Sequence, residues 1–129
     1  HIRRNSALQV HNSVFTGWPY GLFLDKANSA AVVKNVLFAG MWKEAKDDAS
    51  ASYFLTAGLG NSSFASTNDV IKTNGLYSSV DAAKVAGASF TDAAISDSFF
   101  TKVNYKGAFD GTNDWTAGWA NWDPQNTDY

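Results

Sequence analysis

The sequence contains no cysteine, which excludes disulfide bonds, thiolate zinc sites and cysteine nucleophiles together. No apolar run approaches the ~20 residues that a membrane-spanning helix requires. Positive charge is also scarce, because ten Lys and Arg stand against twelve Asp and Glu, for a net charge of −2. Such a chain has no basic field to hold nucleic acid or an anionic membrane. The expected partners therefore include neither nucleic acid nor a bilayer that the chain spans.

Glutamate is almost absent as well, with Glu44 alone against eleven aspartates. Helical proteins favour Glu, Lys and Leu on their surfaces, whereas this chain is rich in Asn, Ser, Thr and Gly and has 15% aromatic residues. Its 129 residues suffice for one domain. The composition predicts a single all-β domain. Because the chain begins with His1 and shows no signal peptide, we expect it to be a C-terminal fragment of a longer protein.

An internal repeat lies in the first forty residues. Residues 10–17 (VHNSVFTG) match residues 33–40 (VKNVLFAG) at Val, Asn, Phe and Gly, with an offset of 23 residues. Repeats of this length are typical of stacked units that cannot bury their apolar faces alone. Each copy has the order strand, Asn corner, strand, Gly/Pro turn, strand, which predicts one rung of a parallel β-helix. An antiparallel hairpin pair whose strands are similar by chance is the alternative.

The β-helix interpretation makes specific placements. Asn12 and Asn35 should occupy equivalent corners, since Asn tolerates left-handed backbone angles, and Phe15 should lie above Phe38. Strand alternation predicts that Leu8, Val10 and Val14 point inward, and that Gln9 and His11 point outward.

The pattern changes after Trp42. Helix formers and charges in residues 43–55 predict a helix or a long excursion. Trp115, Trp119 and Trp122 have helical spacing after a potential N-cap, Asp114, and Pro124 would end that helix. The expected organisation has three parts. Residues 1–42 form β-helix rungs, and residues 43–98 form an excursion with further strands at 69–72 and 76–77 and a helical turn at 82–86. Residues 99–129 contain the last strand, at 99–103, and the cap.

Residues 99–109 (FFTKVNYKGAF) and 114–119 (DWTAGW) resemble the C-terminal part of uncharacterised secreted proteins of Bacteroidota that carry right-handed parallel β-helix repeats. Residues 4–25, with NSVF and GWPYGL, resemble the last rungs of the same proteins. The resemblance implies a right-handed parallel β-helix of a few rungs, with a short helical excursion and an aromatic C-terminal cap. It also implies a secreted or cell-surface location, but no activity and no site residues.

Motifs for catalysis are weak. The chain has no Gly-x-Ser-x-Gly turn, and His1 and His11 have no partner at motif spacing. Most aspartates sit beside Gly, Asn, Ser or Thr, where they serve turns rather than glycoside cleavage. The bases that a lyase would need are Arg3, Arg4, Lys26 and Lys34. The sequence favours a non-catalytic structural or adhesive module; the alternative is a fragment of a polysaccharide lyase or glycoside hydrolase.

Asp110, Asn113 and Asp114 offer oxygen ligands for a metal ion. They lack the spacing and the closing Glu of an EF-hand loop, so a tight turn with an N-cap explains them equally well. We therefore expect no cofactor, with Ca²⁺ as the only ion that these residues leave open.

The tryptophans are the best candidates for binding. A row formed by Trp115, Trp119 and Trp122 would bind polysaccharide if exposed, or close the end of the β-helix if buried. We expect the cap. The expected partners are then a polysaccharide, the rest of the parent chain, or a second copy that pairs with the open strand edge near residues 3–10.

Overall fold

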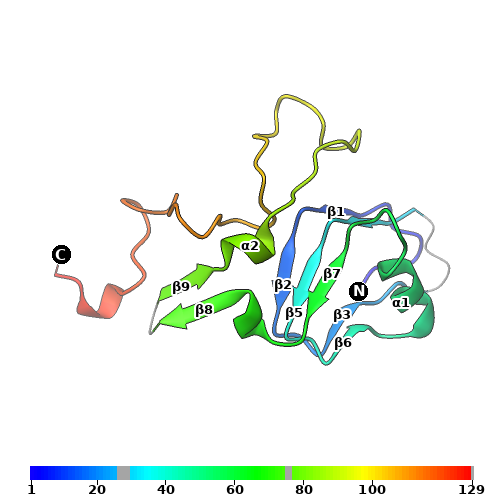
Figure 1. Ribbon diagram of the computed structural model, residues 1–129, viewed down its shortest axis with the longest axis horizontal. Coiled ribbons are helices and arrows are strands. Elements are labelled where there is room, and N and C mark those ends of the chain that lie inside the picture. The colour runs from blue at the N-terminus through cyan, green and yellow to red at the C-terminus, as the bar shows by residue number, and fades with distance from the viewer. Residues whose placement is uncertain (26–29, 75–76, 129) are drawn as a thin grey trace.

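The computed structural model describes residues 1–25, 30–74 and 77–128, which consist mostly of short strands and turns (Figure 1). In chain order the elements are β1 (Gln9–His11), β2 (Val14–Thr16), β3 (Tyr20–Leu22), β4 (Val32–Lys34), β5 (Leu37–Ala39), β6 (Lys43–Ala45), α1 (Asp48–Phe54), β7 (Ser62–Phe64), η1 (Thr67–Asp69), β8 (Ile71–Asn74), β9 (Tyr77–Val80), α2 (Ala82–Val85) and η2 (Pro124–Asn126). The predicted predominance of strands is confirmed. None of the helices in these ranges has the length and hydropathy needed to cross a membrane.

Three short parallel sheets form one part of the molecule, which we call the parallel-strand region (residues 2–64). They have the orders β1–β4, β2–β5–β7 and β3–β6. In the second sheet Phe15 lies opposite Phe38, which is the offset of 23 residues in the sequence repeat. Figure 1 shows β2, β5 and β7 side by side. The two copies of the repeat are therefore parallel neighbours, and the antiparallel hairpin alternative is wrong.

The corners between the first and second sheets also agree with the prediction. Asn12 and Asn35 have φ values of 47° and 57°, and Asn35 Nδ2 donates to Asn12 Oδ1 at 2.8 Å. Gly60 follows in the next copy with a φ of +67°, and a Cβ there would lie 3.0 Å from Asn35 Oδ1. Asn and Gly are the residues that adopt this left-handed conformation at low cost.

The first hydrophobic core lies between the sheets and contains Phe38 and Phe54, and the exposed Phe15 packs against Phe38 from outside it. The ring centroids of Phe15 and Phe38 are 5.9 Å apart, and those of Phe38 and Phe54 are 4.7 Å apart. Phe54 comes from α1, which begins at Asp48 because Asp47 caps it by accepting the N–H of Ser50 at 2.8 Å. The helix is therefore shorter than predicted for 43–55, since the first residues of that range form β6, which pairs with β3. Parallel pairing thus continues beyond Trp42.

A second core covers the other face of β5. Leu37 and Ala39 point away from the first core and pack with Val70 and Val85, which come from the segments that precede β8 and end α2. Val14 also packs here, so its predicted inward orientation is wrong. Leu8 remains exposed, while Val10 packs against the first core as expected.

Residues 99–103, predicted as the last strand, form no strand. A single antiparallel bridge joins Tyr105 to Ala86 instead. Aspartate side chains compete for backbone N–H groups in this part of the chain; for example, Asp97 Oδ1 accepts the N–H of Phe99 at 2.7 Å. The segment therefore satisfies its backbone through local turns rather than through a sheet.

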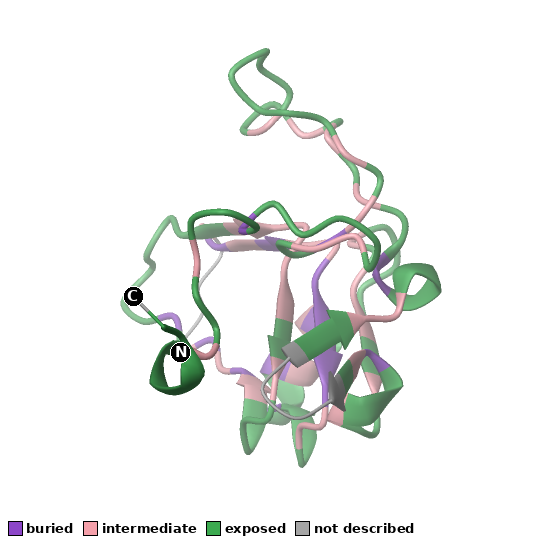
Figure 2. Cartoon of the chain, turned by 90° about the vertical axis from the view of Figure 1, so that its left-hand side faces the viewer, coloured by how far each residue is buried: buried purple, intermediate pink, exposed green. Residues whose placement is uncertain are grey.

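The predicted tryptophan helix and aromatic cap are also wrong. Residues 115–119 form turns, and Gly118, with a φ of +88°, interrupts any helix between Trp115 and Trp122. The C-terminal segment (residues 99–128) first returns to the parallel-strand region, where Gly107 donates its N–H to the Asn12 carbonyl at 2.7 Å, and then extends beyond the β8–β9 hairpin (Figure 1). Buried residues gather in the parallel sheets and the elements packed on them, whereas this segment is mostly exposed (Figure 2). Phe54, and not a tryptophan, stacks on Phe38 in the first core.

Candidate functional site

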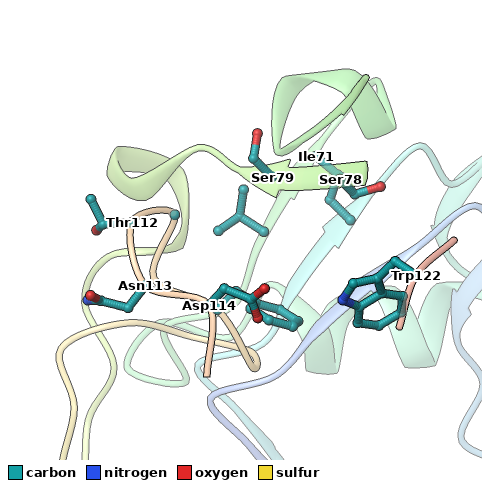
Figure 3. Close-up of a pocket in the computed structure, with 10 residues that line it drawn as sticks. Ile71, Ser78, Ser79, Thr112, Asn113, Asp114 and Trp122 are labelled. Atoms are coloured by element: carbon teal, nitrogen blue, oxygen red, sulfur yellow. The ribbon is translucent and has the colours of Figure 1, made fainter. Parts of the chain in front are cut away.

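A pocket of about 370 Å³ lies where the C-terminal segment meets the β8–β9 hairpin. Ile71 and Ser78 line it from the hairpin, while Asp114 and Trp122 line it from the C-terminal segment (Figure 3). Its size is within the range of small-molecule sites, about 300–1,000 Å³. Apolar walls with a few polar groups make it a candidate binding site.

Asp110 builds the loop on one side of this pocket. Its Oδ1 accepts the N–H groups of Asn113 at 2.7 Å and Thr112 at 2.8 Å, and its Oδ2 accepts Asn113 Nδ2 at 2.6 Å. These hydrogen bonds lower the pKa of the Asp110 carboxyl to about 2, and the bond from the Asn113 backbone N–H contributes most. Gly111 lets the loop approach β9, because its φ is +87° and a Cβ would lie 2.6 Å from the Val80 carbonyl oxygen.

The predicted metal ligands are thus mainly turn-forming residues. Both oxygens of Asp110 accept hydrogen bonds from the loop, and Asn113 is their main donor. Within residues 1–25, 30–74 and 77–128, no group of three or more His, Cys, Asp or Glu side chains could hold a metal ion.

Thr116 joins two walls of the pocket. This buried residue donates its N–H to Asp114 Oδ1 at 2.8 Å, and its hydroxyl donates to the same oxygen. Trp122 Nε1 in turn donates to Thr116 Oγ1 at 3.2 Å. Asp114 and Trp122 are therefore held in fixed relative positions. The sequence gives little indication of the role of Thr116, because an Asp two residues before a Thr is a common turn pattern.

The three tryptophans are exposed, with 57% of Trp115, 69% of Trp119 and 52% of Trp122 accessible. Each ring N–H is nevertheless bonded within the chain: Trp115 Nε1 donates to the Ala108 carbonyl at 2.8 Å, and Trp119 Nε1 donates to that of Trp115 at 3.0 Å. Phe109, Trp115 and Trp119 also form a row, with centroids 5.8 and 5.5 Å apart. The chain therefore orients the rings and uses their N–H groups, and Trp115 lies between Phe109 and Trp119 in the row.

The residues considered for catalysis lie elsewhere. On β1, His11 Nε2 lies 3.2 Å from Gln9 Oε1. Arg3 binds Asp25 at 3.0 Å and Lys34 binds Asp92 at 2.7 Å. Arg4 is exposed and does not line the pocket, and Lys26 lies outside the described residues. The structure brings Asp114 and Trp122 together at the pocket, with Trp115 and Trp119 beside them, but none of these basic residues.

Comparison of the chain with protein-family models, curated proteins and solved structures finds no match. Its function is therefore inferred from its own residues.

Proposed function

We propose that the protein is a non-catalytic extracellular module that binds polysaccharide at the pocket and at the adjoining tryptophans. The observation that carries this proposal is the combination of three indoles that are more than half exposed with ring N–H groups that are already bonded. Such rings offer flat apolar faces on which the C–H faces of sugars can stack. Because the chain already orients them, binding costs less ordering of side chains.

Polar groups beside the rings suit sugar hydroxyls. Ser78 and Asp114 line the same pocket as Trp122, so a sugar stacked on that indole has hydroxyl and carboxylate partners within reach. A small number of polar groups on apolar walls is the usual composition of a site that orients a small ligand.

We further propose that the parallel-strand region consists of turns of a right-handed parallel β-helix, as the resemblance to secreted proteins of Bacteroidota implies. The parallel register of 23 residues and the Asn12–Asn35 hydrogen bond support this. Leu8, Phe15 and Tyr20, which lie in or beside the first copy of the repeat, are exposed. Their exposure favours a structural or adhesive role in which this edge receives the rest of a longer chain or a second copy.

Replacement of Trp119 by alanine tests the binding proposal. Retention of the protein in native gels that contain soluble polysaccharides, both neutral and acidic, should be lost, while the melting temperature should change little because the ring is exposed. Trp42→Ala is the matched control, since Trp42 is 82% exposed on the parallel-strand region and should not affect retention.

Three outcomes would contradict the proposal. If every polysaccharide that retains the natural protein also retained Trp119→Ala to the same extent, the tryptophans would not be part of the binding site. A loss of about 3–5 kcal/mol of stability would restore the cap interpretation. Release of reducing ends or unsaturated products from the polysaccharide would favour the enzyme alternative.

A further inference from the structure

The charge of the pocket points to the class of sugar that it accepts. We infer that the site binds neutral polysaccharide segments and rejects those that carry carboxylate or sulfate groups. This inference deepens the proposed function and rests on it.

Asp114 presents a negative charge to the pocket. Its Oδ1 accepts two hydrogen bonds from Thr116, whereas its Oδ2 is bonded to none of the described residues. Figure 3 shows the carboxylate turned towards Trp122. A sugar ring on that indole would therefore have its hydroxyls beside an oxygen that only accepts hydrogen bonds. Hydrogen bonds from hydroxyls to a carboxylate are stronger than those between neutral groups.

No positive charge balances Asp114 in the lining. Among the described residues that line the pocket, none is Lys, Arg or His, and its serine and threonine hydroxyls are neutral. Asp110 lies outside the lining but in the same loop, and its carboxylate stays ionised at neutral pH because loop hydrogen bonds hold its pKa at about 2. An incoming anion would lose water against Ile71, Phe109 and Trp122 and face like charge without a counter-ion.

Pairs of polymers that share a backbone and differ in charge test this inference. We would compare hydroxyethylcellulose with carboxymethylcellulose, and dextran with dextran sulfate, by affinity electrophoresis of the natural sequence. In any pair that shows retention, the neutral polymer should bind at least about tenfold more tightly, as expected for like charges a few ångströms apart.

The results separate the two proposals. If no member of any pair and no polysaccharide of the panel above retained the protein, the proposed function would be overturned. Equal or tighter binding to an acidic member would overturn only the inference on charge, because a sugar site would then still exist.

Asp114→Asn tests whether this carboxylate is the source of the selectivity. The amide oxygen can still accept from Thr116, so the link to Trp122 is kept while the charge is removed. The preference for the neutral polymer should fall by about tenfold. Asp48→Asn, an equal change of charge on α1, should leave the preference unchanged. An Asp114→Asn protein that keeps the full preference would contradict the assignment.

Discussion

The parallel-strand region and the C-terminal segment use the same kinds of residue in opposite ways. In the parallel-strand region, Phe38 lies between two other rings and is only 3% exposed. In the C-terminal segment, Phe99 is 85% exposed although it forms an edge-to-face pair with Phe100. Aromatic residues become core where a neighbouring copy of the strand closes over them, and remain available for binding where the chain forms turns.

The backbone explains this difference. Residues of β5 are paired on both sides, by β2 and by β7, so their side chains have neighbours above and below. In the C-terminal segment, Asp97, Asp110 and Asp114 accept the N–H groups of residues two positions later. Those local bonds remove the donors that a sheet would use and leave the rings at the surface.

The largest expected effect of a single substitution distinguishes the two regions directly. Phe38→Ala should lower the free energy of unfolding by about 3–5 kcal/mol, because it leaves a cavity beside Phe54, which stacks on the Phe38 ring, and Phe15, which meets it edge to face. Phe99→Ala removes a phenyl ring from an exposed position and should change the free energy of unfolding by less than about 0.5 kcal/mol. Urea unfolding of both variants measures the contrast, and equal losses would show that the C-terminal segment contributes to the core.

A smaller effect is expected at the asparagine corner. Asn35→Ala should cost about 1–3 kcal/mol, since it puts Ala at a φ of 57° and removes hydrogen bonds to Asn12 Oδ1 and to the Gly87 carbonyl. Asn35→Gly restores the backbone freedom and should recover part of this loss. In the C-terminal segment, Asn121→Ala removes two exposed hydrogen bonds, one to Thr127 Oγ1 and one from the Asp123 N–H, and should cost less than about 0.5 kcal/mol. Similar thermal melting of Asn35→Ala and Asn121→Ala would contradict the role of the corner.

The smallest effect is a local response to acid. Asp110 has a pKa of about 2 in the folded protein, below its value of about 3.9 in an unfolded chain. The stabilisation of the loop is therefore fully present above about pH 4 and is lost as the pH falls through about 2. Amide NMR signals of Thr112 and Asn113 should titrate near pH 2 and should not do so in Asp110→Asn. A midpoint near 4 would show that the turn does not hold the carboxylate.

Sequence reasoning succeeded where local chemistry and repetition agree. The offset of 23 residues predicted which strands pair, and the left-handed tolerance of Asn predicted the corners at Asn12 and Asn35. It failed for the tryptophans, because a spacing of i, i+4, i+7 defines a common face only on a helical backbone. Gly118 and the turn at Asp114 prevent a helical backbone here, and the spacing of the tryptophans does not indicate this.

By itself, then, the sequence determined the strand-rich class, the parallel register of the repeat and the turns at the aspartates, since each depends on neighbouring residues or on an internal repeat. The tertiary structure alone decided which aromatic rings are buried and where the pocket lies. Ile71 and Ser78 of the β8–β9 hairpin line the same cavity as Trp122, from which they are far apart in the chain. Their meeting depends on how the C-terminal segment lies against the β8–β9 hairpin, and no local pattern of residues encodes that contact.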